Sequence, residues 1–307
     1  MTNAPAVTVV GSLNLDLVVT VGRLPGRGET VVGLSTVTGP GGKGGNQAAA
    51  AGALSSNVVM VGRVGDDSAG QGLRRDLSDR GVDTSAVLAT DGVTTGTATV
   101  AVEPDSGENL IIVAPGANAL LTPDDVDIEA VRSASVLLLQ LEIPLPAVQA
   151  AVLLATGRVV LNPAPPQPLP DSLLARVDVL VPNEWELARL AGADSPAESE
   201  HREPAELAAL ARRVTDRDVV VTMGGRGALI VSGDLEPVLI APPKVTPIDT
   251  TGAGDCFCGA LSVGLSRGDL LVDAVRFAVA AAALSTTASG ARGLLPDAAA
   301  VEKTQAS

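Results

Sequence analysis

Short runs of β-branched and aliphatic residues alternate with longer segments of helical spacing, and this alternation restricts the possible fold more than any other feature of the chain. The expected strands are 7–10, 57–61, 136–140, 159–161, 177–181 and 218–222, and the expected helices are 46–54, 68–80, 145–156, 184–190, 203–214, 254–265 and 271–288. Strands separated by helices of roughly ten to fifteen residues form parallel sheets with helices on both faces. The sequence therefore predicts an α/β fold of three layers around a central, mostly parallel sheet.

Residues 15–38 and 97–113 break this alternation, because they have strand-like patterns without intervening helices. We expect them to form a small β-sheet that projects from the α/β body. The expected lid comprises 13–38 and 95–114, and the body comprises 1–12, 39–94 and 115–307. A sheet of that size is rarely stable alone. It should therefore cover a cleft, pair with a second subunit in a homodimer, or do both.

Charge and composition exclude some classes of function. The net charge of −14 argues against general nucleic-acid binding, although the acidity also fits a simple role in solubility. The chain shows neither a secretory signal nor an apolar run long enough for a bilayer, so we expect a cytoplasmic protein without membrane contact. Tyrosine is absent, and the single histidine, His201, lies in a polar stretch that we expect to be exposed. General-base work therefore falls to Asp, Glu or Lys.

The segment 249–255 reads Asp-Thr-Thr-Gly-Ala-Gly-Asp and precedes a long apolar segment of helical spacing. A chain that passes through Gly252 and Gly254 into a helix directs several backbone N–H groups at one point, where the helix dipole also favours an anion such as phosphate. Asp255 would be a carboxylate beside that point, placed to accept a proton. An anion site beside a base is what phosphoryl transfer to a hydroxyl requires. The alternative is that Asp255 is an ordinary first-turn acid on the helix dipole.

A second glycine cluster spans 39–47 and includes Lys43 and Asn46. It contains a formal G-x-G-x-x-G match, but it does not follow the first strand, as a dinucleotide-binding turn would. It is not a P-loop, because Gly44 follows Lys43 where Ser or Thr is required. We interpret it as a loop whose bare backbone lets a ligand approach, with Lys43 and Asn46 as polar contacts. A plain glycine turn is the alternative.

Polar residues also stand where strands could present them to a ligand. Asn14 and Asp16 alternate with leucines, so both should lie on one face of a strand and could hold vicinal sugar hydroxyls, although an exposed strand edge would show the same pattern. Glu142, the pair Asn183 and Glu186, and the segment 222–227 each follow a predicted strand. Open parallel sheets bind ligands at that edge. Asn183 could equally cap a helix.

Together, the segments 41–46 and 249–255 resemble the two motifs of the PfkB family of carbohydrate kinases, in the right order and separation. The resemblance covers about 7–296, and Lys43, 141–142 and 161–165 are closer to the ribokinases of that family than to its fructokinases or adenosine kinases. It implies a ribokinase-like fold with a small β-sheet lid. It also implies ATP-dependent phosphorylation of D-ribose to D-ribose 5-phosphate.

The resemblance also implies roles for individual residues. The sugar hydroxyls would be held by Asn14, Asp16, Gly42, Lys43, Asn46, Glu142 and Asp255. Asp255 would be the base for the 5-hydroxyl, and Gly252, Ala253 and Gly254 would form the anion hole. ATP would be bound by Asn183, Thr222, Met223, Gly224, Gly225, Arg226, Gly227 and Gly254. Glu186 would organise Mg²⁺ through water, and a potassium site would use Asp249, Thr251, Ser285, Ala288 and Gly290.

Three residues depart from the family pattern. Val279 replaces a polar residue near the adenine, Cys258 replaces an Asn beside ATP, and Leu294 replaces a Ser that helps to bind the monovalent cation. Two further functions stay open within this fold: phosphorylation of deoxyribose or a keto-sugar, and sugar binding by a regulator without catalysis. A dinucleotide-dependent oxidoreductase is a third alternative, but it leaves 249–255 unexplained.

Overall fold

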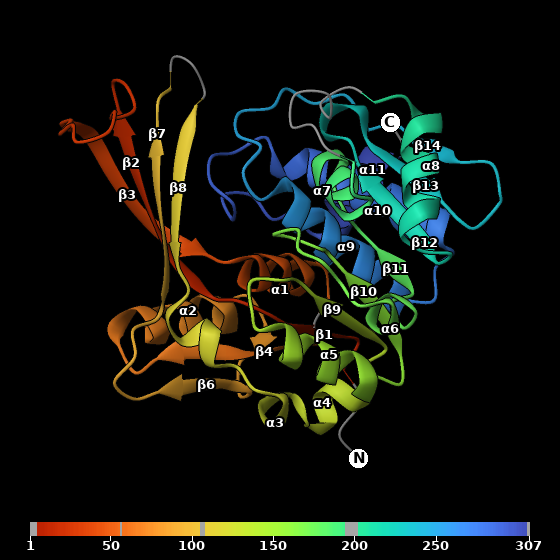
Figure 1. The fold of residues 1–307 in the computed structure, drawn as a ribbon, viewed down its shortest axis with the longest axis horizontal. Helices are drawn as coiled ribbons and strands as arrows, with labels where there is room; N and C mark the ends of the chain where they lie inside the picture. Colours follow the sequence, from red (N-terminus) through yellow and green to blue (C-terminus); the bar gives the residue numbers. More distant parts are fainter. Residues whose placement is uncertain (1–4, 56, 105–107, 194–201, 306–307) are drawn as a thin grey trace.

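The structure, a computed structural model, describes residues 5–55, 57–104, 108–193 and 202–305. His201 lies outside these residues. Figure 1 shows an α/β body and a small sheet that projects from it. The strands of the central sheet are β1 (Val7–Val10), β4 (Val58–Gly65), β5 (Val82–Asp83), β6 (Val87–Thr90), β9 (Val136–Leu139), β10 (Arg158–Leu161), β11 (Val179–Leu180), β12 (Asp218–Thr222), β13 (Ala228–Val231) and β14 (Val238–Ile240). The projecting sheet contains β2 (Asn14–Val21), β3 (Gly33–Gly41), β7 (Gly96–Val102) and β8 (Asn109–Ala114).

The central sheet has the order β14-β13-β12-β11-β10-β9-β1-β4-β5, with β6 paired to β4. Its strands are parallel except for β13 and β14, which run antiparallel to their neighbours. The helices are α1 (Lys43–Leu54), α2 (Ser68–Asp79), α3 (Pro123–Val126), α4 (Glu129–Arg132), α5 (Leu145–Leu154), α6 (Asp171–Leu174), α7 (Glu184–Leu190), α8 (Pro204–Val214), α9 (Ala253–Ser266), α10 (Leu271–Ser285) and α11 (Ala298–Gln305), with 3₁₀ turns η1 (Gly116–Leu120) and η2 (Gly224–Arg226).

Helices cover both faces of the central sheet, because successive side chains of a buried strand point to opposite faces. On β9, Leu138 packs into the core shared with α1, α9 and α10, whereas Leu137 and Leu139 pack into the core shared with α5 and α8. The predicted three-layer α/β fold is confirmed. Among the described residues, no helix combines the length and the apolarity needed to cross a membrane.

The projecting sheet, which we call the lid, has the order β3-β2-β7-β8, with β2 and β7 parallel and the outer pairs antiparallel. Its strands come from the two segments that break the alternation in the sequence. All residues of β8 are exposed, although adjacent residues point to opposite faces of a strand. The body therefore covers neither face of this edge strand.

The second glycine cluster is not the loop that the sequence suggested. Gly39 and Gly41 belong to β3, and α1 begins at Lys43, so Gly44 and Asn46 are helical. Gly42 has a φ of +78°, and a Cβ on Gly44 would lie 2.6 Å from the backbone nitrogen of Ser12. The glycines are thus required where α1 starts against the end of β1. Several elements are shorter than predicted: α10 ends at Ser285, α5 ends at Leu154, and β11 spans only Val179–Leu180.

Candidate active site

A cavity of about 140 Å³ lies at the carboxyl ends of β10, β11 and β12, beside the N-terminal ends of α1, α7 and α9. Open parallel sheets bind ligands at this edge. The residues that line it are Lys43, Asn162, Val181, Asn183, Glu186, Thr222, Gly252, Gly254, Asp255 and Cys258. Seven of these ten were predicted as site residues, so segments far apart in the sequence do converge on one cavity.

Asp255 lies in the first turn of α9 and is only 9% exposed. Its Oδ2 accepts a hydrogen bond from Asn46 Nδ2 at 3.0 Å, and its Oδ1 accepts one from Gln47 Nε2 at 3.0 Å. Burial raises the pKa of Asp255, and Lys43 and the two amide donors offset only part of that shift. A carboxylate that is desolvated and fixed in position is suited to accept a proton from a bound hydroxyl.

The N-terminal end of α9 is formed by Gly252, Ala253 and Gly254. Gly252 is the N-cap residue with a φ of +75°, and a Cβ there would lie 2.8 Å from Ala291 Cα, so both conformation and space require glycine. Gly254 faces open space and lines the cavity. The Ala253 N–H already donates to the Thr250 carbonyl at 3.2 Å. Gly252 and Gly254 both line the cavity, whereas Ala253 would have to share its N–H with the Thr250 carbonyl in order to contact an anion.

Beside the cavity, Asn14 and Asp16 extend from the start of β2. Asn14 is 3% exposed, and its Oδ1 accepts a hydrogen bond from Asn118 Nδ2 at 2.8 Å. Asp16 Oδ1 is buried and has no hydrogen-bond partner in the described residues. Burial and the neighbouring Glu142 raise the pKa of Asp16 to about 6, although Arg292 opposes the shift. An unpartnered buried carboxylate oxygen is costly unless a ligand hydroxyl completes its hydrogen bonds.

Glu142 and Lys43 connect this polar group to the cavity. Glu142 Oε2 accepts hydrogen bonds from Ser12 Oγ at 2.5 Å and from the Lys43 backbone N–H at 3.0 Å. Burial works to lower the pKa of Lys43, but Asp255, Glu142 and Glu186 outweigh it and raise the pKa. Lys43 therefore stays charged between three carboxylates, where it can also pair with a phosphate.

The residues predicted for ATP differ in their placement. Asn183 caps α7 in a capping box, since its Oδ1 accepts from the Glu186 N–H at 2.7 Å while Glu186 Oε2 accepts from the Asn183 N–H at 2.8 Å. The helix-capping alternative is thus correct for Asn183, which also lines the cavity. Burial raises the pKa of Glu186. Its carboxylate is an oxygen ligand of the kind that Mg²⁺ prefers, alone or through water.

Of the segment 222–227, only Thr222 lines the cavity. Met223 is buried, and Gly224 and Gly225 are exposed in η2. The Arg226 guanidinium pairs with Glu184 and donates to the Arg202 carbonyl, so it holds this turn against the start of α7. Gly227 has a φ of +92°, and a Cβ there would lie 2.0 Å from the Ile240 carbonyl oxygen.

The residues predicted for potassium lie in the loop before α9 and at the end of α10. The Asp249 carboxylate joins these loops, because it accepts from the N–H groups of Thr251 at 2.9 Å and Gly290 at 2.8 Å. Ser285 Oγ donates to the Ala282 carbonyl, which ties it to its own helix. Among the described residues, no cluster of three or more His, Cys, Asp or Glu side chains could hold a metal.

The three departures from the family pattern fall in different surroundings. Cys258 lines the cavity, and burial raises the pKa of its thiol far above the usual range, so it stays a neutral thiol. Val279 is 5% exposed within the core of α9 and α10. Leu294 is 37% exposed, and its side chain offers no oxygen ligand. The cavity is thus slightly more apolar here than an Asn at position 258 would make it.

Sequence reasoning missed four polar residues that hold the site together. Gln47 donates to Asp255 and also to Asn162 Oδ1 at 3.2 Å, and Gln140 donates to Gln47 Oε1 at 2.6 Å. Arg292 donates to Asn46 Oδ1 at 2.9 Å. The sequence signal for Gln47 and Gln140 was only that they stand next to or near Asn46 and Glu142, and Asn162 lies in the segment 161–165 that resembles the ribokinases. No local pattern marked Arg292.

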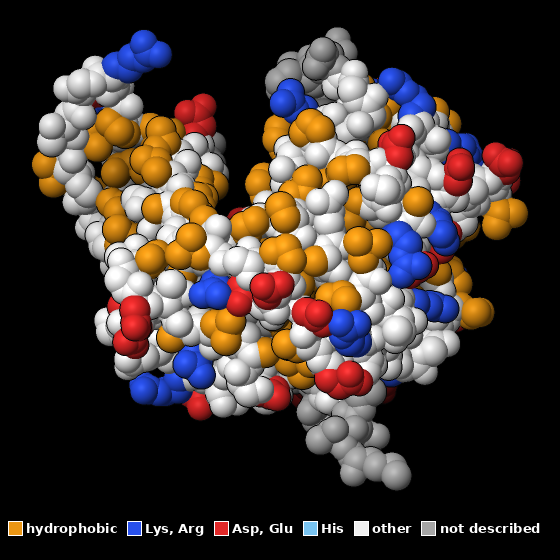
Figure 2. Space-filling view, turned by 60° about the horizontal axis from the view of Figure 1, so that its bottom comes forward, with side chains coloured by type: hydrophobic (Ala, Val, Ile, Leu, Met, Phe, Trp, Pro, Cys, Tyr) orange, Lys and Arg blue, Asp and Glu red, His pale blue; other side chains and the backbone are white. Residues whose placement is uncertain are grey.

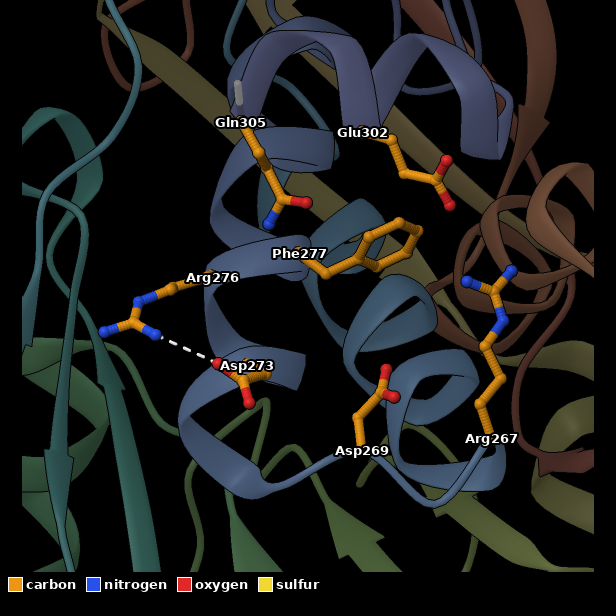
Figure 3. A pocket seen from close by; sticks show the side chains of 7 residues that line it. All are labelled: Arg267, Asp269, Asp273, Arg276, Phe277, Glu302 and Gln305. Carbon is orange, nitrogen blue, oxygen red and sulfur yellow. Dashed lines mark hydrogen bonds and ion pairs between the residues drawn. The ribbon is translucent and has the colours of Figure 1, made fainter. Parts of the chain in front are cut away.

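A second cavity, of about 420 Å³, lies at the far end of α9 and α10, against α11 (Figure 3). Its charged groups are largely engaged with the protein itself. Arg276 pairs with Asp273, and the Arg267 guanidinium lies 5.2 Å from the centre of the Phe277 ring and donates to the Leu54 carbonyl. None of the predicted site residues line it. The smaller cavity, where helix N-termini and titratable groups converge, is therefore the candidate active site.

Comparison with known proteins agrees with this geometry. The model of the pfkB family of carbohydrate kinases matches residues 4–298. The chain is 37% identical over 302 residues to a ribokinase of Schizosaccharomyces pombe, covering 94% of both chains, and 34% identical to a deoxyribokinase of Salmonella typhi, covering 94% of this chain and 95% of that one. The structure of Arabidopsis thaliana ribokinase complexed with ribose and ATP superposes with a TM-score of 0.84 at 34% identity, covering 98% of this chain and 99% of that one.

Proposed function

Because the chain belongs to the pfkB family of carbohydrate kinases, we propose that it transfers the γ-phosphoryl group of ATP to the 5-hydroxyl of D-ribose. The observation that carries the proposal is the buried Asp255 carboxylate in the first turn of α9, on the wall of the same cavity as Lys43 and Gly254. This arrangement combines a base, a cation and a helix N-terminus. Phosphoryl transfer uses these three groups together.

The residues divide the reaction between them. Asp255 takes the proton of the 5-hydroxyl while the oxygen forms a bond to the γ-phosphorus, and the bond from that phosphorus to the leaving oxygen of ADP breaks. The Gly254 amide, at the positive end of α9, stabilises the charge on the transferred group, with Gly252 and Ala253 shaping the turn. Lys43 adds a fixed positive charge. Glu186 would hold Mg²⁺, directly or through water, and the ion would supply further positive charge to the phosphates.

Sugar recognition is assigned to the polar group beside the cavity. Asp16 offers an unpartnered buried oxygen to a hydroxyl, and Asn14, Asn46 and Glu142 lie around it. The Gly41 and Gly42 backbone lies close to this group, since a Cβ on Gly41 would lie 2.0 Å from Asp16 Oδ2. A wall of carboxylates and amides without aromatic rings suits a small, fully hydroxylated ligand.

A panel of sugars, assayed by ADP release with and without potassium, tests the function. We expect D-ribose to give the highest kcat/KM, and the family resemblance predicts activation by potassium despite Leu294. Faster turnover of deoxyribose, which the similarity to a deoxyribokinase makes the main alternative, would reassign the substrate. Ribose binding in calorimetry without any ADP formation would instead indicate a regulator without catalysis.

The pKa of Asp16 gives a pH dependence for sugar binding. The ionised carboxylate accepts hydroxyl hydrogen bonds on both oxygens, protonation converts one of these acceptors into a donor, and the pKa of Asp16 is raised to about 6. The dissociation constant for ribose should therefore be constant well above pH 6 and should rise as the pH falls through that value. Calorimetric titration between pH 5 and 8 measures this, and Asp16→Asn should bind weakly with a much flatter profile. Equal pH profiles in the two proteins would contradict the assignment.

We propose that two copies of the chain associate through their lids. Figure 2 shows hydrophobic side chains gathered on the lid. Over its two faces, the exposed apolar residues of β3 and β8 are Leu34, Val37, Leu110, Ile111, Ile112 and Val113. A patch of this kind marks an association surface. The neighbours Ile111 and Ile112, 58% and 60% exposed, point to opposite faces of the lid, so only one face can meet a partner lid.

The two isoleucines form a matched pair for the test. We expect Asp at one of these positions to convert the dimer into a monomer, and Asp at the other to leave the dimer intact, because a charge buried in an apolar interface is unfavourable. Sedimentation analysis of both variants measures the effect. A monomeric wild-type protein, or two variants that stay dimeric, would show that the lid is not the interface.

A further inference from the structure

We propose that Arg292 is a positioning residue for this reaction. Its guanidinium holds the Asn46 amide in the one orientation in which the amide donates to Asp255. The proposal rests on the proposed function, because Asn46 and Asp255 act there on the sugar. Arg292 lies in the segment after α10 and is 7% exposed. Arg292 is 246 residues away from Asn46 in the sequence, which explains why no local pattern marked it.

The guanidinium of Arg292 donates to oxygens on three different elements. Nε donates to Asn46 Oδ1 on α1 at 2.9 Å, Nη1 donates to Asp76 Oδ2 on α2 at 2.5 Å, and Nη2 donates to the Gly41 carbonyl at the end of β3 at 3.2 Å. A guanidinium presents its donors in a rigid planar fork. Contacts to three elements therefore fix the plane of the group, and with it the direction of Nε.

This bond decides which way the Asn46 amide faces. A carboxamide has an acceptor oxygen on one side and a donor NH₂ on the other. With Oδ1 bonded to Arg292 Nε, the NH₂ is directed at Asp255 Oδ2, 3.0 Å away. The flipped amide would place NH₂ against the guanidinium and oxygen against the carboxylate, and both contacts would be repulsive. Arg292 thus selects one of two orientations.

The other oxygen of Asp255 is held in a parallel way. Gln140 Nε2 donates to Gln47 Oε1 at 2.6 Å, and Gln47 Nε2 donates to Asp255 Oδ1 at 3.0 Å. Each oxygen of the base therefore accepts from an NH₂ whose amide is oriented by a further buried donor. The carboxylate plane is fixed from both sides, which leaves the remaining lone pairs for the substrate hydroxyl. Fixed orientation of reacting groups is a large source of rate.

The ion pair with Asp76 does not account for this arrangement by itself. Asp76 also pairs with Arg80 at 3.2 Å, closer to solvent, so it has a second cationic partner. Burying a guanidinium is costly unless all its hydrogen-bonding groups are satisfied. Each of the three guanidinium nitrogens of Arg292 donates one hydrogen bond, and two of the three acceptors, Asn46 Oδ1 and the Gly41 carbonyl, border the candidate sugar site.

A double-mutant cycle on the full-length enzyme tests the proposal. We expect Arg292→Met to lower kcat/KM for ribose by roughly 10- to 100-fold with little change in KM for ATP, the scale of a displaced reacting group. In the Asn46→Ala background, Arg292→Met should lower kcat/KM for ribose by less than about twofold, because the amide that Arg292 orients is no longer present. Full loss in both backgrounds would overturn the proposal, since Arg292 would then act elsewhere.

Arg63→Met is the matched control. Arg63 is also paired through its guanidinium, to Asp125 at 2.7 and 2.9 Å and to Thr90 at 3.0 Å, but away from the cavity. It should lower thermal stability and leave kcat/KM unchanged. Arg292→Lys controls for a folding defect in Arg292→Met. Lysine keeps a positive charge beside Asp76 but lacks the rigid planar fork of the guanidinium. We expect it to fold and to show the same coupled loss, and full activity in this variant would contradict the orienting role.

The outcomes separate this proposal from the function on which it rests. A wild-type protein that phosphorylates no sugar would reject both. An active wild-type enzyme whose activity is impaired by Asn46→Ala but not by Arg292→Met would reject the positioning role and leave the kinase function intact.

Discussion

Replacing Asp255 with alanine should lower kcat for ribose phosphorylation by roughly 10²-fold or more, the usual scale for loss of a general base. The carboxylate is 9% exposed and accepts two amide hydrogen bonds, so no water or neighbouring acid can easily take its place. KM for ATP should change little, because in the proposed mechanism this side chain acts on the hydroxyl. Steady-state kinetics with saturating ATP measure the effect.

Asp269→Ala provides the control for the Asp255 variant. Asp269 lines the second cavity and lies just after α9, at the opposite end of that helix from the proposed base (Figure 3). Its loss should leave kcat unchanged. If Asp255→Ala retained near-normal turnover while staying folded, the residue would be an ordinary first-turn acid, and the proposed mechanism would lose its base.

Replacing Asp16 with alanine should raise KM for ribose by roughly 10- to 100-fold, with a much smaller change in KM for ATP. The magnitude follows from one hydrogen bond between a carboxylate and a sugar hydroxyl, worth about 1.5–3 kcal/mol. The structural basis is the buried Asp16 Oδ1, which no group in the described residues satisfies. The dissociation constants of ribose and of ATP, measured separately by calorimetry, show which of the two ligands the Asp16 side chain contacts.

Asn14→Ala is the comparison that sharpens the Asp16 result. Asn14 is the first residue of β2, two residues before Asp16, but its Oδ1 already accepts a hydrogen bond from Asn118 at 2.8 Å. It should therefore affect ribose binding less than Asp16 does. Equal losses of ribose and ATP affinity in Asp16→Ala would mean that the side chain supports the fold of the site rather than the sugar.

The architecture was predictable because each layer leaves a local signature. The continuous aliphatic run of β9 predicts a strand buried on both faces, and Leu137 and Leu138 do pack into the cores on opposite faces of the sheet. The lid was predictable because 15–38 and 97–113 have strand patterns without helices. The start of α1 was mispredicted, because the sequence around Lys43 and Gly44 is typical of a loop. Only the tertiary structure shows that the helix begins there, packed so closely against the Ser12 backbone that Gly44 is required.

By itself, the sequence determined the α/β class, the lid and the chemical types gathered in 249–255 and 41–46, because hydrophobic periodicity and glycine turns depend only on neighbours along the chain. The tertiary structure alone decided which groups face Asp255. Asn46 is 209 residues away from it, and Arg292 is 246 residues away from Asn46. Such pairings depend on strand register and on how helices pack, and the orientation of an amide depends on a donor that no local pattern reveals.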